Sequence, residues 1–249
     1  MGTWLGSCWV KRQGGLGGLE RAWAKLLSLE IGAVTISPAV EGPSFSRATG
    51  TSWEAYYRAT EGRPPRPLFL DAIAFLPDSA PHDRALIGID LGCGDGTETL
   101  ALLMHGWTVT AVDSAPEAIA RLRALVPPKD EPRLTTLVAS FHELKLPDAD
   151  FVYAGLSLPF CSPPEFAEAW RRITNALRPE GIFAGHFFGP RDSWADQPGM
   201  TSQTREELET LLAGFDVHRL EEQDEDGAAV CGPKHWHVFH VIASKRQTG

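Results

Sequence analysis

The chain has 249 residues, of which 43% are hydrophobic and 22% are charged, a composition that suits one well-buried α/β domain with some extra length. Its formal net charge of −9 argues against a nucleic-acid backbone or an anionic membrane as the main partner. We expect no membrane span and no signal peptide, because no apolar run approaches the roughly 20 residues of a spanning helix. Four widely spaced cysteines without a C-x-x-C pair favour free thiols and a cytoplasmic location.

The first 50 residues differ from the rest of the chain. They contain two Gly-Gly pairs and carry five basic and three acidic residues, whereas the remainder carries 18 basic and 29 acidic residues. The sequence therefore predicts a flexible N-terminal extension over 1–50 and a folded domain over 51–249.

From residue 51 onward, apolar runs typical of buried strands alternate with amphipathic helical segments. The expected strands cover 85–91, 108–112, 133–139, 150–155 and 182–188. The expected helices cover 97–105, 114–125, the segment from Phe166 to Leu177, and 204–212.

The ends of these helices carry recognisable signals. Capping boxes formed by Ser114 with Glu117 and by Thr204 with Glu207 are predicted to begin two of the helices. Pro179 and Gly181 are expected to end the helix that contains Phe166.

The C-terminal region predicts a β-hairpin. Its strands are expected over 215–222 and 235–244, with the acidic run 221–226 as a solvated loop and the turn near Asp226 and Gly227. Strand–helix alternation predicts crossover connections and parallel pairing. The expected fold class is α/β, with a seven-stranded, mostly parallel, doubly wound (Rossmann-like) sheet that ends in a C-terminal antiparallel hairpin.

The stretch "IDLGCGDGTETL" at 89–100 predicts a ligand site after the first strand. Gly92 and Gly94, on either side of Cys93, let bare backbone approach a ligand closely. Asp113 ends the second strand 21 residues after Gly92, where its carboxylate can accept hydrogen bonds from both hydroxyls of a ribose. This pairing indicates a ribose-bearing cofactor, and the alternative is a glycine-rich turn without a ligand.

The details of the loop distinguish between ribose cofactors. The dinucleotide fingerprint G-x-G-x-x-G requires a third glycine where this chain has Thr97. A pyrophosphate also prefers a helix N-terminus without nearby negative charge, but Asp95 and Glu98 flank this one. A cationic cofactor, S-adenosylmethionine, fits better, since Asp90 would attract its charged methionine end.

The segment "IDLGCGDGTETLALLMHGWTVTAVDSAPEAI", followed by "ASFHEL", "FVYAGLSLPF" and "LRPEGIF", resembles class I S-adenosylmethionine-dependent methyltransferases. The resemblance covers about 53–245 and is closest to bacterial small-molecule enzymes, loosely of the tellurite-resistance type. It implies that Gly92 and Gly94 pass along the methionine part and that Asp113, beside Ser114, holds the ribose. Two departures are Ser140 in place of a frequent acidic residue and Glu180 in place of a glycine.

The resemblance also implies roles for residues after the third and fourth strands. Ser140 and Phe141 would frame the adenine, and Ala154 and Gly155 would lie under the methionine. The segment "WEAYYRATEGRPPRP" at 53–67 would close the pocket through Tyr56 and Tyr57, with Arg63 binding the methionine carboxylate. The alternative for this segment is a surface helix that packs two aromatic residues.

The acceptor side is predicted from loops that follow the fourth and fifth strands. Leu158, Phe160, Arg191 and Trp194 suggest a small, partly apolar acceptor. His186 is the candidate catalytic base, and the alternative is a packed core histidine.

The histidine-rich stretch "CGPKHWHVFH" at 231–240 contains residue types that can bind a metal. His235 and His237 face one way in a strand and His240 the other. We therefore expect no metal.

The sequence thus predicts a methyltransferase (EC 2.1.1.-) that transfers a methyl group from S-adenosylmethionine to a small-molecule acceptor by in-line displacement. The alternatives are an NAD(P)-dependent oxidoreductase and a non-catalytic S-adenosylmethionine-binding protein. No nucleic-acid or membrane partner is expected, and the chain is expected to be a monomer or a homodimer.

Overall fold

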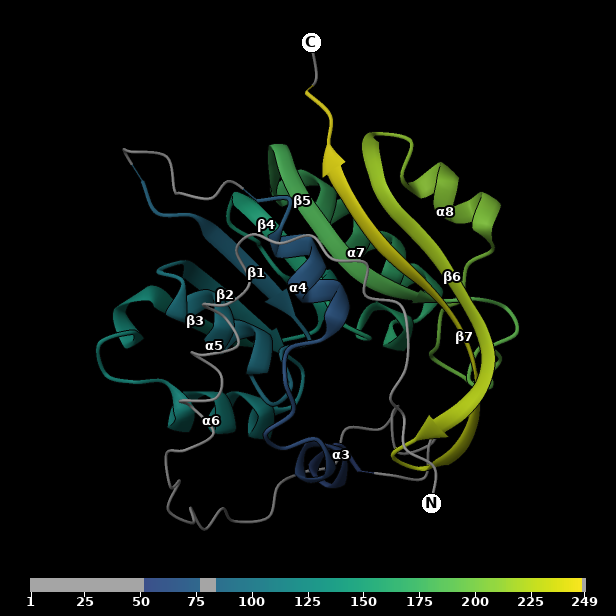
Figure 1. Cartoon of the computed structure of the whole chain (residues 1–249), viewed down its shortest axis with the longest axis horizontal. Helices are drawn as coiled ribbons and strands as arrows, with labels where there is room; N and C mark the ends of the chain where they lie inside the picture. Colours follow the sequence, from purple (N-terminus) through teal and green to yellow (C-terminus); the bar gives the residue numbers. More distant parts are fainter. Residues whose placement is uncertain (1–51, 77–83, 248–249) are drawn as a thin grey trace, which may run out of the picture. The chain divides into compact units, whose positions relative to one another are not determined.

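The computed structural model describes residues 52–76 and 84–247 (Figure 1). The extension predicted over 1–50 lies outside these residues. None of the described helices is both long and apolar enough to cross a membrane.

A seven-stranded sheet in the order β3-β2-β1-β4-β5-β7-β6 organises the chain. The first five strands pair in parallel, and β7 pairs antiparallel with both β5 and β6. This arrangement confirms the predicted mostly parallel sheet with an antiparallel hairpin at one edge. The strands are β1 Ile87–Leu91, β2 Thr108–Asp113, β3 Leu134–Val138, β4 Ala149–Ala154, β5 Leu177–Phe188, β6 Phe215–Ala229 and β7 Gly232–Lys245.

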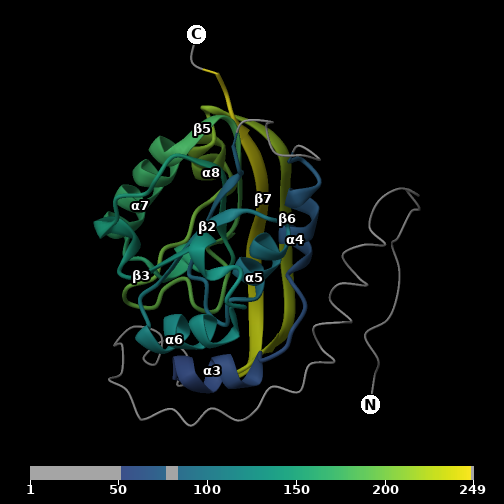
Figure 2. The same cartoon turned by 90° about the vertical axis from the view of Figure 1, so that its left-hand side faces the viewer.

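Helices cover both faces of the sheet (Figure 2). Apolar residues of α4, α5 and α6 form one core layer with one face of the sheet, and those of α7 and α8 form a second layer with the other face. Because both faces are covered, the central strands read as nearly continuous apolar runs. The helices are α3 Trp53–Ala59, α4 Pro67–Ile73, α5 Thr97–Met104, α6 Pro116–Leu125, α7 Pro163–Ala176 and α8 Arg205–Leu211.

One of the two predicted capping boxes is confirmed and the other is wrong. Thr204 and Glu207 form the expected box at α8. At α6 the N-cap residue is Ala115 and no side chain caps it. The Ala115 amide instead donates to the carboxylate of Asp113 at 2.9 Å, so the turn before α6 is organised by Asp113 and not by Ser114.

The end of α7 also differs from the prediction. The helix ends at Ala176, and Leu177 already opens β5. Pro179 therefore lies beyond the helix, within the strand. Glu180, which stands where the resembling family has a glycine, adopts a positive φ of 64°, a conformation that costs a non-glycine residue about 1–2 kcal/mol.

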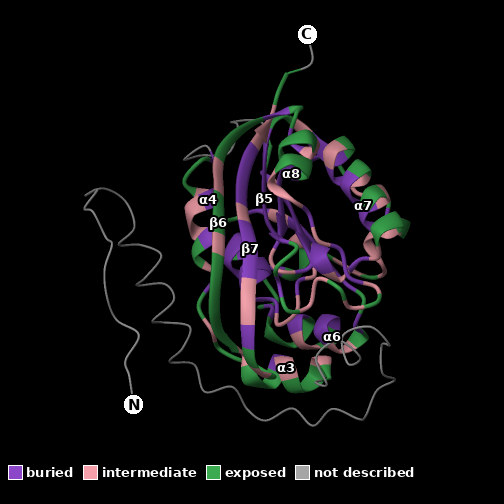
Figure 3. Cartoon of the chain, turned by 90° about the vertical axis from the view of Figure 1, so that its right-hand side faces the viewer, coloured by how far each residue is buried: buried purple, intermediate pink, exposed green. Residues whose placement is uncertain are grey.

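The C-terminal hairpin is longer than predicted. Strands β6 and β7 pair from Phe215 with Lys245 to Ala229 with Gly232, so the turn lies at 230–231 and the prediction of a turn near Asp226 is wrong. The acidic run 221–226 is therefore part of a largely exposed edge strand (Figure 3) and not a loop. Opposite charges across the strands permit this, since Asp224 and Asp226 both contact the ring of His235.

We predict that a methyl group at Gly96, the last glycine before α5, strongly destabilises the fold. Gly96 has a φ of 80°, and a Cβ there would lie 2.6 Å from Leu122 Cδ1 in the core. Gly199 is a matched control, because its φ is 84° and a Cβ there would meet nothing within 4 Å. In urea unfolding, Gly199→Ala should cost about 1–2 kcal/mol of strain, and Gly96→Ala about 1–3 kcal/mol more from overpacking. Equal losses would show that Leu122 does not restrict this turn.

Candidate cofactor and acceptor site

A cavity of about 390 Å³ opens at the carboxyl ends of β1, β2, β4 and β5. Its walls come from the loop after β1, from the residues following β2 to β5, from α3 and the segment after it, and from the tip of the β6–β7 hairpin. In an open α/β sheet this edge is where ligands bind. The topology therefore places the glycine loop, the end of β2 and the hairpin tip around one space.

The glycine loop presents bare backbone to this cavity. The amides of Gly92 and Cys93 donate to the carbonyl of Val112 at 2.8 and 3.0 Å, which ties the loop to the end of β2. Gly94 has a φ of 52°, and a Cβ there would lie 3.2 Å from the ring of Tyr57. A side chain at this position would press against Tyr57, so glycine allows α3 to pack closely on the loop.

Asp113 is buried and held from three sides. Its Oδ2 accepts from the Gly94 amide at 2.9 Å, and its Oδ1 accepts from the Ala115 amide at 2.9 Å and the Tyr57 hydroxyl at 3.5 Å. Burial raises the pKa of this carboxyl, against the opposing effect of these donors. An ionised carboxylate has about four acceptor positions, so Asp113 retains capacity for a ligand hydroxyl.

Asp90 supplies a second acidic group on the wall of the cavity. Its Oδ2 accepts from Thr99 Oγ1 at 2.7 Å. Burial, followed by the nearby charge of Glu98, raises the pKa of Asp90 to about 7. A cationic ligand would favour the ionised form of this side chain.

Arg63 is neutralised by acidic residues of the glycine loop and α5. Its guanidinium donates to both carboxylate oxygens of Glu98 at 2.7 Å and also contacts Asp95 at 3.1 Å. Burial would raise the pKa of the Glu98 carboxyl, but the hydrogen bonds from Arg63 hold it below its ordinary value. The structure therefore pairs Arg63 within the protein, where the sequence predicted that it binds a methionine carboxylate.

Arg66, a few residues further on, also contacts Glu98, because its backbone amide donates to Glu98 Oε1 at 3.0 Å, but its guanidinium has a different partner. Its Nη2 donates to the Tyr56 hydroxyl at 3.1 Å, and among the described residues no carboxylate lies within ion-pair distance of its guanidinium. Arg66 lines the cavity together with Tyr153. Tyr153 is 1% exposed, and its hydroxyl has no hydrogen-bond partner within the described part of the chain. An arginine and a buried hydroxyl donor thus face the cavity with capacity for an anionic group.

Two acidic side chains already lie at the N-terminus of α5. The Thr97 amide donates to Asp95 Oδ1 at 3.1 Å, and Glu98 occupies the first turn of the helix. A pyrophosphate at this point would meet two carboxylates instead of free amides. The glycine loop therefore disfavours a dinucleotide.

The structure brings most of the predicted site residues to the cavity. Those that line it are Tyr56, Tyr57, Arg63, Asp90, Gly92, Cys93, Gly94, Asp113, Ser114, Ser140, Phe141, Gly155, Phe160 and Trp194. Four predicted residues are not among the lining residues: Ala154, Leu158, His186 and Arg191. Ala154 and Leu158 are fully buried in the core beneath the site.

His186 is buried in β5, and its ring packs against that of His240 at a centroid distance of 5.0 Å. Burial, together with the charges of His240 and Arg66, holds the pKa of His186 well below its ordinary value. His186 is not among the residues that line the cavity. Its catalytic role therefore stays a prediction.

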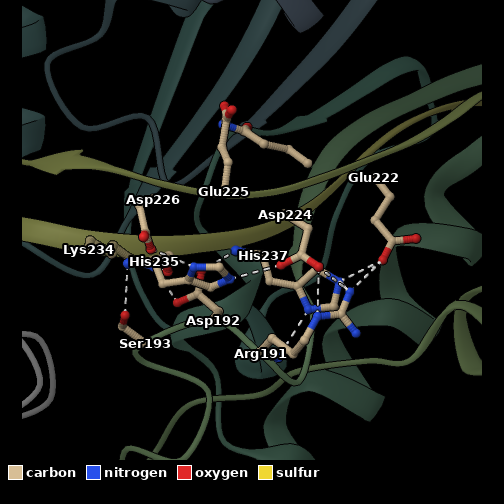
Figure 4. Close-up of polar contacts among 11 residues, drawn as sticks. Arg191, Asp192, Ser193, Glu222, Asp224, Glu225, Asp226, Lys234, His235 and His237 are labelled. Carbon is tan, nitrogen blue, oxygen red and sulfur yellow. Dashed lines mark hydrogen bonds and ion pairs between the residues drawn. The ribbon is translucent and has the colours of Figure 1, made fainter.

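Arg191 contacts side chains of both hairpin strands (Figure 4). Its Nη2 lies 2.5 Å from Asp224 Oδ2, 3.0 Å from Glu222 Oε1 and 3.3 Å from His237 Nε2. The ligand atoms of those three residues lie within 4.8 Å of one another, a spacing that suits a metal ion. The guanidinium already provides the cation for this cluster.

Several lining residues were missed by sequence reasoning: Trp53, Arg66, Tyr153, Phe188, Trp236 and the hairpin tip 228–231. Trp53 and Arg66 lie in the segment 53–67 that was expected to cover the cofactor, so that segment held the signal. The hairpin tip was missed because the turn was predicted too early in the chain.

Comparison with known proteins finds similarity to methyltransferases. A model described as "Methyltransferase domain" matches residues 89–185, which span β1 to most of β5 and include the glycine loop and Asp113. This part of the chain is therefore similar to a methyltransferase domain.

Among curated proteins, malonyl-[acyl-carrier protein] O-methyltransferase of Halorhodospira halophila is 33% identical over 125 residues, which are 46% of this chain and 40% of that protein. Trans-aconitate 2-methyltransferase of Escherichia fergusonii is 32% identical over 99 residues, 38% of this chain and 36% of that protein. The match therefore spans well under half the length of these relatives.

Solved structures share the fold of this chain. TehB from Haemophilus influenzae has a TM-score of 0.61 at 16% identity and covers 78% of this chain and 68% of its own. The 1,6-didemethyltoxoflavin-N1-methyltransferase of Burkholderia thailandensis, solved with S-adenosylhomocysteine, has a TM-score of 0.53 at 21% identity. The match covers 85% of this chain and 94% of that enzyme's chain.

The residues present fit S-adenosylmethionine, the methyl donor of the methyltransferases that this chain resembles. The cavity has acidic groups for a ribose and for a cationic centre in Asp113 and Asp90, and Gly92 and Gly94 line it without side chains. Arg66 and the unpartnered Tyr153 hydroxyl provide donors for a carboxylate. When bound, the cofactor supplies an activated methyl group on a sulfonium.

We predict that S-adenosylmethionine affinity rises with pH because Asp90 must ionise. With a pKa of about 7, Asp90 is mainly protonated at pH 6 and mainly ionised at pH 8. Its attraction for the cationic methionine end is therefore lost below that pKa, and affinity should rise about tenfold between the two values. Calorimetric titration across this range checks it. Asp90→Asn, measured with the same ligand, should remove this rise. An unchanged profile would mean that Asp90 does not contact the charged end.

Proposed function

We propose that the protein transfers a methyl group from S-adenosylmethionine to a small-molecule acceptor by in-line displacement. The observation that carries this proposal is one continuous cavity with two chemically different ends. Charged groups and the glycine loop line the cofactor end, and the rings of Phe160, Trp194 and Trp236 line the other end. Such a cavity can align a methyl donor and an acceptor while it excludes water.

The proposed reaction breaks the bond from sulfur to the methyl carbon and forms one from a lone pair of the acceptor to that carbon, and the proton on the attacking oxygen or nitrogen is released to water. The leaving thioether is neutral and needs no proton, so the chain need not supply a general acid. Asp113 and Phe141 hold the nucleoside, and Asp90 attracts the ammonium group. We assign the methionine carboxylate to Arg66, because Arg63 is already paired with Glu98 and Asp95.

The same features support proposals for the cellular location, the catalytic unit and the class of partner. We propose a cytoplasmic location, since Cys93, Cys161 and Cys231 are free thiols. We also propose that residues 51–249 act as the catalytic unit, as a monomer or homodimer, on a small molecule and not on nucleic acid, because the net charge of −9 opposes a polyanionic partner.

Two alternatives are weighed against specific observations. An NAD(P)-dependent oxidoreductase is disfavoured, because Asp95 already lies at the N-terminus of the helix that would receive the pyrophosphate. A non-catalytic cofactor-binding protein would share the glycine loop and Asp113, but it would not require an aromatic chamber next to the cofactor.

We predict that two variants distinguish the residue that binds the ribose from the residue that binds the methionine carboxylate. Asp113→Ala should weaken S-adenosylhomocysteine and 5′-methylthioadenosine alike, by at least about tenfold, because both carry the ribose. Arg66→Gln should weaken only S-adenosylhomocysteine, since 5′-methylthioadenosine has no carboxylate. Calorimetry on the purified protein measures both affinities, with NADH as a third ligand.

Arg58→Gln is the matched control, because Arg58 lies on α3 and pairs only with the exposed Glu54 at 2.8 Å among the described residues. Binding of NADH without either sulfur compound would overturn the proposal. An Arg66→Gln variant that loses both sulfur ligands equally would instead show that Arg66 is not specific for the carboxylate.

A further inference from the structure

An aromatic wall forms the acceptor end of the cavity. We give this name to Trp53, Phe160, Phe188, Trp194 and Trp236, all of which line the cavity. Their rings contact one another in sequence, with centroid distances of 5.4 Å from Trp53 to Phe160, 6.3 Å from Phe160 to Trp194, and 5.9 Å from Trp194 to Trp236. The wall therefore runs from α3 beside the cofactor end to β7.

Aromatic walls of this kind have two common uses. They stack against flat rings, or they surround an ammonium or methylammonium group, which the negative π faces attract. The two uses require ligands of opposite character, so the electrostatics of the wall decide between them.

The protein's own Lys234 already makes cation–π contacts with three rings of the aromatic wall. Lys234 is 4% exposed, and its Nζ lies 4.2 Å from the centroid of Trp236, 4.4 Å from that of Trp194 and 4.8 Å from that of Phe188. Lys234 is not among the residues that line the cavity. It therefore contacts three rings of the wall from the protein side, while the same rings contact the cavity.

Asp192 holds Lys234 in this place. The Asp192 carboxylate is buried and forms an ion pair with Lys234 Nζ, and it also accepts from the backbone amides of Trp194 at 3.0 Å and His237 at 3.2 Å. Asp192 and Lys234 belong to the network of polar contacts drawn in Figure 4. Because both side chains are buried and satisfied, Lys234 is not free to turn toward a ligand.

A cation in contact with a π system draws electron density toward itself. The ring surfaces that face the cavity are then less negative than in an ordinary aromatic cage, and they attract a second cation less strongly. Electron-rich rings stack well against such electron-depleted surfaces. The charges next to the wall therefore select against an ammonium ligand and for a flat, electron-rich ring.

We propose that the acceptor is a planar, electron-rich aromatic or heteroaromatic molecule that enters uncharged, with its nucleophilic oxygen or nitrogen on or next to the ring. Lys234 acts as a specificity-determining residue that excludes cationic amines. This inference rests on the proposed methyl-transfer function, because it takes the acceptor to stack on the wall beside the bound cofactor.

The test compares two fused-ring probes of similar size in the presence of saturating S-adenosylhomocysteine. 2-Naphthol is neutral and electron-rich, and N-methylquinolinium is a planar cation. Calorimetry, with tryptophan fluorescence quenching as a second readout, should give at least tenfold tighter binding of 2-naphthol. Trp236→Ala should weaken 2-naphthol by about tenfold, whereas Phe75→Ala, an exposed aromatic outside the cavity, should have no effect.

The combined substitution of Lys234→Met and Asp192→Asn removes the buried ion pair without leaving one charge alone. In this variant N-methylquinolinium should bind to within about threefold of 2-naphthol. Unchanged discrimination in the folded variant would overturn the role of Lys234. If the variant does not fold, the wild-type comparison decides, because equal or tighter binding of the cation would overturn the inference.

The two proposals fail in different ways. Binding of S-adenosylhomocysteine without preference for 2-naphthol would overturn only the acceptor class. Failure of S-adenosylhomocysteine to bind would overturn the proposed function, and the acceptor class with it.

Discussion

The site depends on the carboxylate of Asp113. This buried group joins three separate segments, since it accepts from the Gly94 amide of the glycine loop, from the Ala115 amide before α6 and from the hydroxyl of Tyr57 on α3. The glycine loop alone would be free to adopt other conformations, because glycine restricts the backbone little. With Asp113 in place, the loop, the end of β2 and the covering helix share one fixed point, and the cavity forms around it.

Charge is distributed along the cavity in a way that matches a methyl donor. The acidic groups Asp90 and Asp113 lie at the cofactor end, and Arg63 is neutralised there by Glu98 and Asp95. Arg66 retains capacity for an anion at the same end. The aromatic wall contains no ionisable side chain. Lys234 contacts its rings but does not line the cavity. A zwitterionic, cationic cofactor and a neutral ring therefore find separate, complementary surfaces.

Much of the fold and of the cofactor site could be predicted from sequence, because local patterns determine them. Apolar runs and helical periodicity located the strands and helices, and the spacing of Gly92, Gly94 and Asp113 depends only on a strand, a turn and the next strand. The pairing of Arg63 could not be predicted in this way, since Glu98 lies 35 residues away and only the folded chain brings it near. The same holds for Tyr153, whose hydroxyl reaches the cavity from a strand that reads as core.

The hairpin shows why acidity alone was a poor guide to a loop. The run from Glu221 to Asp226 looks solvated in isolation, but Arg191 and His235 compensate it across space. Because the charges are compensated, β6 and β7 extend until their tip reaches the cavity. Residues 228–231 are among those that line it. The buried pair of Lys234 and Asp192 joins residues 42 positions apart, and no periodicity in the sequence reports it.

The most direct test of the account is a crystal structure of the protein with S-adenosylhomocysteine. We predict that the ribose hydroxyls donate to Asp113, that the carboxylate contacts Arg66 while Arg63 keeps its pairs with Glu98 and Asp95, and that the sulfur faces the aromatic wall. A ligand bound elsewhere, or one whose ribose does not contact Asp113, would contradict the central role given to this carboxylate.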